Sequence, residues 1–335
     1  MELFNPFKDT IFLKETSDMQ ERFNALERLI NEYPNNEKLK EEYYITKQGL
    51  YGENEIAYQL KKSNLGLYVL RDINIEYEDL KAQIDYVVIT KAYTYFIECK
   101  NLYGNITVDN KGDFIREYSY NGKKIRKGIY SPLRQVEAQR DVFKKIWNIS
   151  LSKNKIINGI KRFFSEDNFT DLYHILVVAA NHETILNMKY APSYMKYKVL
   201  KAEQLVRQLE YELSKIKEDE RDNKNEMEKE AKFFLSINKE NNNDYYEYYK
   251  NKCINQQTKP INKDKLKDKL LEFRKKRSNS MNIPAYYVFT NDELDKLIEM
   301  QPTSIEELKQ CKILSTIKVK THGELIIDII KNNRN

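Results

Sequence analysis

Two short apolar segments, residues 82–90 (AQIDYVVIT) and 93–100 (YTYFIECK), constrain the fold of this chain more than any other feature. Each has the length and the β-branched or aromatic residues of a buried strand. Charged residues interrupt both segments: Asp85 in the first, and Glu98 and Lys100 in the second. Because side chains alternate faces along a strand, Glu98 and Lys100 share one face and Cys99 points to the other.

The positions of these charges predict a site. Twelve residues separate Asp85 from Glu98, enough for a hairpin that brings both carboxylates to one point near the strand ends. Two carboxylates this close repel each other, and burying them is costly unless a cation lies between them. Mg²⁺ is a hard cation that one or two carboxylates can hold, together with waters and a substrate phosphate. Lys100 lies beside this point and could hold a scissile phosphate or help to polarise a water.

Taken singly, each of these residues has a simpler interpretation. Asp85 could cap a turn, and Glu98 and Lys100 could form an ion pair on an edge strand. Glu53, at the expected start of a helix, could join the site or only complement the helix dipole. Cys99 is expected to be a small core residue and not a reactive thiol. The joint pattern favours a site over these separate explanations.

Composition excludes several classes of protein. The chain has 335 residues, 41% of them apolar, enough for more than one core. Its three cysteines are far apart and odd in number, which indicates neither a disulfide framework nor a zinc ribbon. The first fifteen residues do not resemble a signal peptide, and the apolar run 175–180 is too short to span a bilayer. We therefore expect a soluble, cytoplasmic protein with no membrane partner.

Positive charge is concentrated in one region. Residues 119–163 contain twelve Lys and Arg against two acids, an excess larger than the +6 of the whole chain. Such a local field attracts polyanions, including nucleic acid, although a solvated lysine-rich surface is the alternative. The predicted nucleic-acid contacts in this region are Lys123, Lys124, Arg126, Lys127 and Arg134.

The order of predicted elements is that of an α/β domain followed by helices. Apolar spacing and cap signals predict helices over 18–34, 36–50, 51–64 and 131–147, and strands over 67–76, 82–90, 93–100 and 173–180. Residues 197–213 are expected to form a short strand and then a helix. Turn signals at 110–114 and 120–124 suggest a further hairpin. Residues 214–261 are dominated by Lys, Glu, Asp and Asn, which suggests a solvated, partly helical linker. We thus expect an N-terminal helical extension (1–47), an α/β domain (48–213), the linker (214–261) and a helical domain (262–335).

Four segments resemble the nuclease-related domain (NERD) of the PD-(D/E)xK nuclease superfamily: YGENEIAYQL (51–60), AQIDYVVI (82–89), FIECKNLYGNI (96–106) and SPLRQVEAQ (131–139). The resemblance covers about residues 48–212. It implies an α/β/α core with a mixed sheet and metal-dependent cleavage of phosphodiester bonds, with Mg²⁺ or Mn²⁺ as the cofactor.

Residue by residue, this resemblance implies that Asp85 and Glu98 hold the metal and that Lys100 is the catalytic lysine. The Gly-Glu pair places Glu53 at the family's helix glutamate, with Glu55 as a less favoured substitute. The implied mechanism is hydrolysis, in which metal ions deprotonate a water and Lys100 supports the nucleophile or the developing charge.

Two glutamines match the family pattern as well. Gln135 lies on the helix that follows the strands and could contact the site or the backbone, or could be an ordinary helix surface residue. Gln83 shares a strand face with Asp85 but has no assigned role. With only three histidines and no Gly-rich phosphate loop, the chain is not expected to use a histidine base or to hydrolyse ATP.

Residues 270–330 resemble the HRDC domain, a five-helix module found in DNA-repair helicases and ribonuclease D. The resemblance is carried by a basic helix end, the segment IPAYYVF (283–289), and Pro302, Lys318 and Gly323. It implies nucleic-acid binding or partner docking, with contacts predicted at Arg274, Lys275, Lys276 and Arg277. Ile313 and Ser315 replace two glycines usual in the family, which weakens the expectation that this turn holds a phosphate.

The sequence thus favours a metal-dependent nuclease that acts on nucleic acid, with DNA preferred, in repair or defence. One alternative is a non-catalytic nucleic-acid-binding protein that kept the fold. Another is a partner-docking module that uses residues 214–261 and the N-terminal helices. The presence of all four expected site residues (Glu53, Asp85, Glu98 and Lys100) favours the nuclease.

Overall fold

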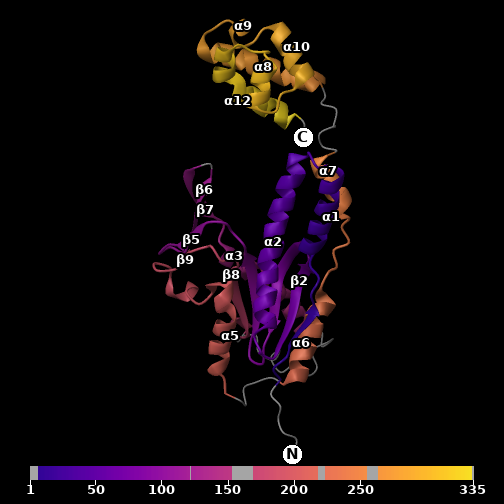
Figure 1. The fold of residues 1–335 in the computed structure, drawn as a ribbon, viewed down its shortest axis with the longest axis vertical. Helices are drawn as coiled ribbons and strands as arrows, with labels where there is room; N and C mark the ends of the chain where they lie inside the picture. Colours follow the sequence, from indigo (N-terminus) through magenta and orange to yellow (C-terminus); the bar gives the residue numbers. More distant parts are fainter. Residues whose placement is uncertain (1–6, 121, 153–168, 218–222, 255–262, 334–335) are drawn as a thin grey trace, which may run out of the picture. The chain divides into compact units, whose positions relative to one another are not determined.

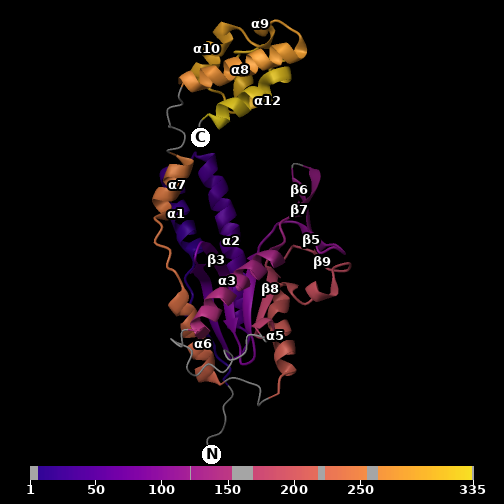
Figure 2. The same ribbon diagram turned by 180° about the vertical axis from the view of Figure 1, so that it is seen from behind.

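The computed structural model describes residues 7–120, 122–152, 169–217, 223–254 and 263–333. These residues form two compact units, 1–250 and 251–335, which are described separately. None of the described helices is long and apolar enough to cross a membrane. Figures 1 and 2 show the ribbon from opposite sides.

The first unit is built on a six-stranded mixed sheet in the order β1-β2-β3-β4-β8-β10. Its strands are β1 (Thr10–Lys14), β2 (Leu67–Tyr77), β3 (Leu80–Ile89), β4 (Thr94–Lys100), β8 (Tyr173–Ala179) and β10 (Val199–Lys201). The strands β2, β3 and β4 are antiparallel neighbours, whereas β4, β8 and β10 run parallel. This mixed sheet confirms the predicted fold class.

Helices cover both faces of this sheet (Figure 1). The helices α2 (Glu37–Lys61) and α5 (Leu205–Ser214) contribute to the core on one face, with Tyr95 and Ile97 of β4. The helices α3 (Pro132–Ser152) and α6 (Lys224–Ile237) cover the other, which receives Phe96. Strand alternation therefore divides the apolar residues of β4 between two cores.

A second sheet, in the order β7-β6-β5-β9, extends from the end of the main sheet. Its strands are β5 (Asn105–Val108), β6 (Phe114–Tyr120), β7 (Lys123–Ile129) and β9 (Leu186–Asn187). The antiparallel pairing of β6 with β7 confirms the hairpin suggested by the turn signals. Gly122 in its turn has φ 74°, a conformation that glycine adopts without steric cost.

The N-terminal segment differs from the expected separate helical extension. Strand β1 extends the main sheet, and α1 (Asp18–Glu32) packs on α2. The expected helices 36–50 and 51–64 are one continuous helix, α2. Gly52 lies within it because α2 runs against the end of β4: a Cβ atom at Gly52 would lie 2.5 Å from Cβ of Asn101. Helix propensity disfavours glycine here, but the close approach requires it.

The expectation of a solvated linker at 214–261 is wrong for its described helices. Met227, Ala231 and Phe234 lie on one face of α6, three or four residues apart, and are buried in the main core. The helix α7 (Tyr245–Cys253) begins with Tyr245, whose hydroxyl donates to Asp18 at 2.8 Å. The abundant charges lie mainly on the outer faces of these helices, which is why composition alone suggested a linker. Residues 218–222 and 255–261 of that segment lie outside the described residues.

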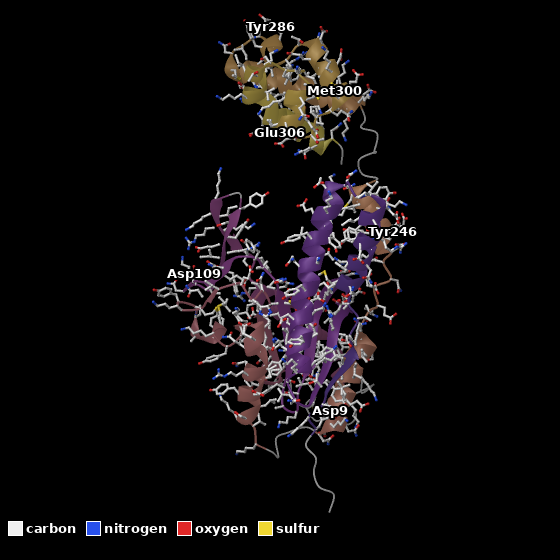
Figure 3. All side chains as sticks on the ribbon, in the orientation of Figure 1. Asp9, Asp109, Tyr246, Tyr286, Met300 and Glu306 are labelled. Carbon is white, nitrogen blue, oxygen red and sulfur yellow. The ribbon has the colours of Figure 1, made fainter. Side chains whose placement is uncertain are left out.

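A tyrosine strengthens the contact between α7 and α1. Tyr246, labelled in Figure 3, donates its hydroxyl to a carboxylate oxygen of Glu32 at 2.5 Å. This hydrogen bond raises the pKa of Tyr246 to about 12, because losing the proton would place two negative charges together.

The second unit has five described helices around one apolar core. They are α8 (Lys263–Met281), α9 (Ala285–Val288), α10 (Asn291–Met300), α11 (Ile305–Gln310) and α12 (Thr316–Asn332). Thr290, Ser304 and Ser315 cap the last three helices through their hydroxyl groups.

Candidate active site

The two strand carboxylates lie across from each other, Asp85 in the middle of β3 and Glu98 near the end of β4. The ladder pairs Tyr86 with Ile97, and continuing that register by one residue places Asp85 opposite Glu98. The backbone N–H of Cys99 donates to Oδ2 of Asp85 at 2.8 Å. The hairpin thus places the two carboxylates on neighbouring strands, close enough for the charge of Glu98 to raise the pKa of Asp85.

A break in strand alternation positions Asp85. In β3, Ile84 and Val87 face the same core although they are three residues apart, and Leu70 and Ile73 do so in β2. Between the latter pair, Asp72 has φ 57°, a left-handed conformation uncommon outside glycine. The alternation of side chains between the two faces of the sheet therefore shifts by one residue at Asp72 and Asp85. Asp85 remains partly exposed, although the strand residues on both sides of it are buried.

Asp72 is held in this conformation by several partners. Its carboxylate accepts from the Gln83 side chain at 2.7 Å and from the Asp18 backbone N–H at 2.7 Å. The Lys14 ammonium donates to the backbone oxygens of Arg71 and Asp72. Gln83, to which the sequence assigned no role, thus braces the kinked strand beside the site.

Glu98 and Lys100 form the centre of the site with two glutamines of α3. Lys100 Nζ donates to Glu98 Oε1 at 2.5 Å and to Gln135 Oε1 at 3.1 Å. Gln139 Nε2 donates to the other oxygen of Glu98 at 2.8 Å. Sequence reasoning included Gln135 but missed Gln139, although the four-residue spacing places both on one helix face.

Burial and charge shape the chemistry of Asp85. Burial raises the pKa of its carboxyl well above the ordinary value, and the negative charges of Glu98 and Glu53 raise it further. The Cys99 backbone N–H and the Lys100 ammonium act in the opposite direction but do not outweigh these effects. The nearby positive charge is therefore too small to keep the pKa of Asp85 at its ordinary value. Burial also raises the pKa of the Cys99 thiol well above its usual range, which agrees with an unreactive core thiol.

Glu53 lies in a separate ion pair. Its Oε2 accepts from Arg71 Nη2 at 2.7 Å and from Arg71 Nε at 2.9 Å, and both side chains are buried. Arg71 Nη1 also donates to Asn54 at 2.8 Å, and the Tyr86 hydroxyl donates to the backbone oxygen of Glu53. Since Glu53 lies in the middle of α2, the first-turn interpretation does not apply. Sequence reasoning missed Arg71, whose signal was a charge within the apolar segment 67–76. The less favoured substitute, Glu55, instead pairs with His182 at 3.3 Å.

The predicted nucleic-acid contacts of the first unit lie on β7 and at the start of α3. Lys123, Lys124, Arg126 and Lys127 belong to β7, and Arg134 to the first turn of α3. Arg126 pairs with Glu117 of β6 at 2.8 Å, and the exposed Arg134 pairs with Glu137 at 3.2 Å. The basic residues between 153 and 163 lie outside the described residues.

The basic run of α8 divides between surface and interior. Lys275 and Lys276 are exposed, whereas Arg274 and Arg277 are half-buried. Arg274 donates to Asn291 at 2.9 Å and lies over the ring of Phe289, so it also connects α8 to the rest of its unit.

The donor set at β3 and β4 fits a hard divalent cation. Asp85 is partly exposed and Glu98 is 2% exposed, and such cations are often held by one or two carboxylates with waters and phosphate. In the described part of the chain, no cluster of three or more His, Cys, Asp or Glu forms a metal site. A cation between the two carboxylates would relieve the repulsion that raises the pKa of Asp85.

Comparison with known proteins identifies two domains. Residues 48–166 match the family model described as the nuclease-related domain (NERD), and residues 263–330 match the HRDC domain. Curated proteins gave no match. Among solved structures, the "D. radiodurans RecQ HRDC domain 3" is 30% identical over 21% of this chain and 93% of its own, with a TM-score of 0.21.

Proposed function

We propose that this chain, which carries a nuclease-related domain at residues 48–166 and an HRDC domain at residues 263–330, hydrolyses phosphodiester bonds of nucleic acid, preferably DNA. The observation that carries the proposal is the group formed by Asp85 in the middle of β3 and by Glu98 and Lys100 at the end of β4. Within it, the Lys100 ammonium lies 2.5 Å from Glu98 and the backbone amide of Cys99 orients Asp85.

Each residue has a definite task in this proposal. Asp85 and Glu98 would hold Mg²⁺ or Mn²⁺, which when bound lowers the pKa of a water and offsets the phosphate charge. Gln139 fixes one oxygen of Glu98, so the carboxylate keeps a single orientation. Lys100, partly exposed and fixed by Glu98 and Gln135, can donate to a phosphate oxygen and stabilise the charge that develops there.

The HRDC domain and the basic strand β7 would bind the nucleic-acid substrate. The exposed Lys275 and Lys276 of α8, together with the four basic residues of β7, can attract the phosphate backbone. Sequence-independent contacts of this kind position a substrate without selecting its sequence.

One observation favours the alternative of a non-catalytic nucleic-acid-binding protein. Both guanidinium contacts of Arg71 go to one oxygen of Glu53 in a buried ion pair, which leaves Asp85 and Glu98 as the two carboxylates at the point where a metal would bind. A site with two carboxylates can bind a cation weakly and still fail to cleave.

The test is cleavage by the purified full chain with Mg²⁺ or Mn²⁺ on plasmid, linear duplex, single-stranded DNA and RNA. Asp85→Asn and Lys100→Ala should abolish cleavage, and EDTA should stop it. Asp79→Asn, an exposed acid in the β2–β3 turn, is the matched control and should cleave normally. Binding without cleavage in every variant would instead support the non-catalytic alternative.

A further inference from the structure

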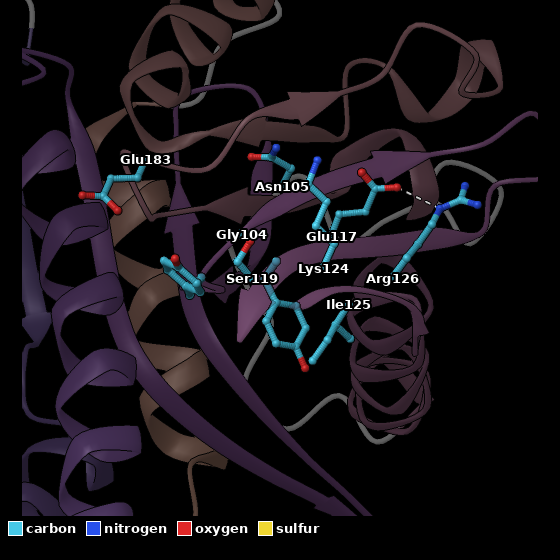
Figure 4. A pocket seen from close by; sticks show the side chains of 10 residues that line it. Gly104, Asn105, Glu117, Ser119, Lys124, Ile125, Arg126 and Glu183 are labelled. Atoms are coloured by element: carbon cyan, nitrogen blue, oxygen red, sulfur yellow. Dashed lines mark ion pairs between the residues drawn. The ribbon is translucent and has the colours of Figure 1, made fainter. Parts of the chain in front are cut away.

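Two hollows meet at the loop that follows β4, where they share lining residues. The larger, of about 670 Å³, lies between α2 and the loop after β4 and is lined by Tyr44, Tyr51 and Tyr103 among others. The smaller, of about 520 Å³, lies against the β6–β7 hairpin and is shown in Figure 4. Tyr103 and Glu183 line both. We call the combined feature the tyrosine groove, defined by Tyr44, Tyr51, Tyr103 and Tyr118.

The tyrosine groove begins next to the end of β4, the strand that carries Glu98 and Lys100. Asn101, the residue after Lys100, lines the larger hollow and donates to the backbone oxygen of Gln48 in α2 at 2.5 Å. On the α2 side, Tyr51 lines the groove two residues before Glu53. The groove thus begins one residue along the chain from Lys100, although none of Asp85, Glu98 and Lys100 lines either hollow.

Three of the tyrosine rings that define the groove are more than half exposed. Tyr44, Tyr51 and Tyr103 are 63%, 52% and 54% exposed. Within the described residues, none of these three rings stacks on another ring or accepts a cation. Three uncovered aromatic surfaces along one groove are suited to flat, apolar ligands.

Cations border the same surface. Arg116 and Lys127 lie 4.6 and 5.6 Å from the ring centre of Tyr118, and Arg116 donates to the backbone oxygen of Tyr103 at 2.6 Å. Lys124 lines the smaller hollow, and the charge of Glu117 is offset by Arg126, the pair drawn with a dashed line in Figure 4. The groove thus combines aromatic faces with basic groups.

From these features we propose that the tyrosine groove binds single-stranded nucleic acid by stacking unpaired bases on Tyr51 and Tyr103. Base faces are covered by neighbouring bases in a duplex, so aromatic side chains can stack only on unpaired bases. A basic track beside such rings is the usual arrangement in proteins that bind single strands. Binding of a single strand in the groove does not require the proposed nuclease activity. The inference rests on the proposed function only where it takes the bound strand to be the substrate of the candidate active site.

The test measures binding apart from cleavage. The full chain is titrated in EDTA against fluorescent 20-nucleotide DNA and RNA strands and the matching duplexes, with anisotropy as the readout. We expect the single strands to bind at least about tenfold more tightly than the duplexes. Tyr51→Ala and Tyr103→Ala should each weaken single-strand binding about tenfold, and the Phe variants by less than about twofold.

A matched control lies on the same helix. Tyr58 of α2 is 52% exposed, like Tyr51, but lies outside both hollows, so Tyr58→Ala should bind as the parent does. Because the HRDC domain is also expected to bind, photocrosslinking with 5-iodouracil strands and mass spectrometry should place adducts on Tyr51 or Tyr103. Thermal melts confirm that each variant is folded.

The outcomes separate this inference from the proposed function. Equal affinity for single and double strands, or adducts confined to residues 263–333, would overturn the groove. If single-strand binding depends on Tyr51 and Tyr103 but the protein never cleaves, the result supports binding by the tyrosine groove and contradicts the proposed nuclease activity. If the chain cleaves nucleic acid but its binding does not change when Tyr51 and Tyr103 are replaced, the result supports the nuclease activity and contradicts binding by the tyrosine groove.

Discussion

The Lys100 ammonium lies 2.5 Å from Oε1 of Glu98, two residues earlier on the same strand. Gln135 and Gln139 of α3 hold the lysine and the carboxylate from the other side of the contact. The lysine is thus fixed on its own strand, and its position does not depend on a mobile loop. This arrangement leads to the first prediction.

Replacing Lys100 by Met should impair the chemical step more than binding. The variant keeps most of the side-chain volume but loses the charge that can stabilise a developing oxyanion, so we expect kcat to fall about 10²- to 10³-fold. Metal-free affinity for the substrate should change by less than about threefold, since one phosphate contact is weak by itself. Single-turnover cleavage and anisotropy measure the two effects. Lys81→Met, at an exposed lysine of β3, should leave both values unchanged, and an equal loss there would contradict the assignment.

Asp85 should make stability depend on pH and on divalent metal. Because burial, Glu98 and Glu53 raise its pKa, the folded state binds this proton more tightly than the unfolded chain does. The stabilisation is fully present below the ordinary pKa of about 3.9 and is lost as pH rises toward the raised value. In EDTA at neutral pH, Asp85→Asn should therefore melt at least about 2 °C above the parent, and this gap should shrink toward pH 4.

Divalent metal should make the parent melt at a higher temperature than Asp85→Asn. Mg²⁺ or Mn²⁺ binds the folded parent and should raise its Tm in a concentration-dependent way, while Asp85→Asn should respond much less. The melts can be followed by fluorescence of Trp147, the single tryptophan, which is buried in the core of the first unit. A parent whose Tm is indifferent to both metals would count against a cation between Asp85 and Glu98.

The buried pair of Glu53 and Arg71 should show strong coupling. Arg71→Met leaves the Glu53 carboxylate buried without its cation and should lower the free energy of unfolding by about 3–5 kcal/mol. Glu53→Gln in the same chain removes the uncompensated charge, so the double variant should recover most of that loss. Urea unfolding followed by Trp147 gives all four corners of the cycle. Additive effects would mean that the ion pair has no part in holding α2 to β2.

The two glycines of α2 should respond oppositely to alanine. A Cβ at Gly52 would lie 2.5 Å from Cβ of Asn101, which is anchored at the end of β4, so Gly52→Ala should cost about 1–3 kcal/mol. At Gly49 the atom nearest to an added Cβ is the flexible end of the Met19 side chain, at 3.1 Å, which can move aside. Helix propensity should therefore determine how Gly49→Ala changes the free energy of unfolding. Gly49→Ala should then be neutral or stabilising by up to about 1 kcal/mol. Urea unfolding of both variants tests the difference, which would vanish if α2 could move away from β4.

The amino-acid sequence by itself determined the local parts of the site. Strand alternation placed Glu98 and Lys100 on one face, and the twelve residues between Asp85 and Glu98 were enough for a hairpin that could bring the carboxylates together. Turn glycines likewise indicated the β6–β7 hairpin. These features depend on neighbouring residues, whose geometry is set by the periodicity of the chain.

Only the tertiary structure decided which distant groups meet. Glu53 looked like a free helix carboxylate, but packing of α2 on β2 brings it to Arg71, eighteen residues away. Residues 224–237 looked solvated because of their charge, but Phe234 and its neighbours bury one face of α6 in the core. The exposed tyrosines became a groove only when α2 lay beside the loop after β4. Periodicity fixes the faces of an element, but the partner that each face meets depends on long-range packing, which no local pattern records.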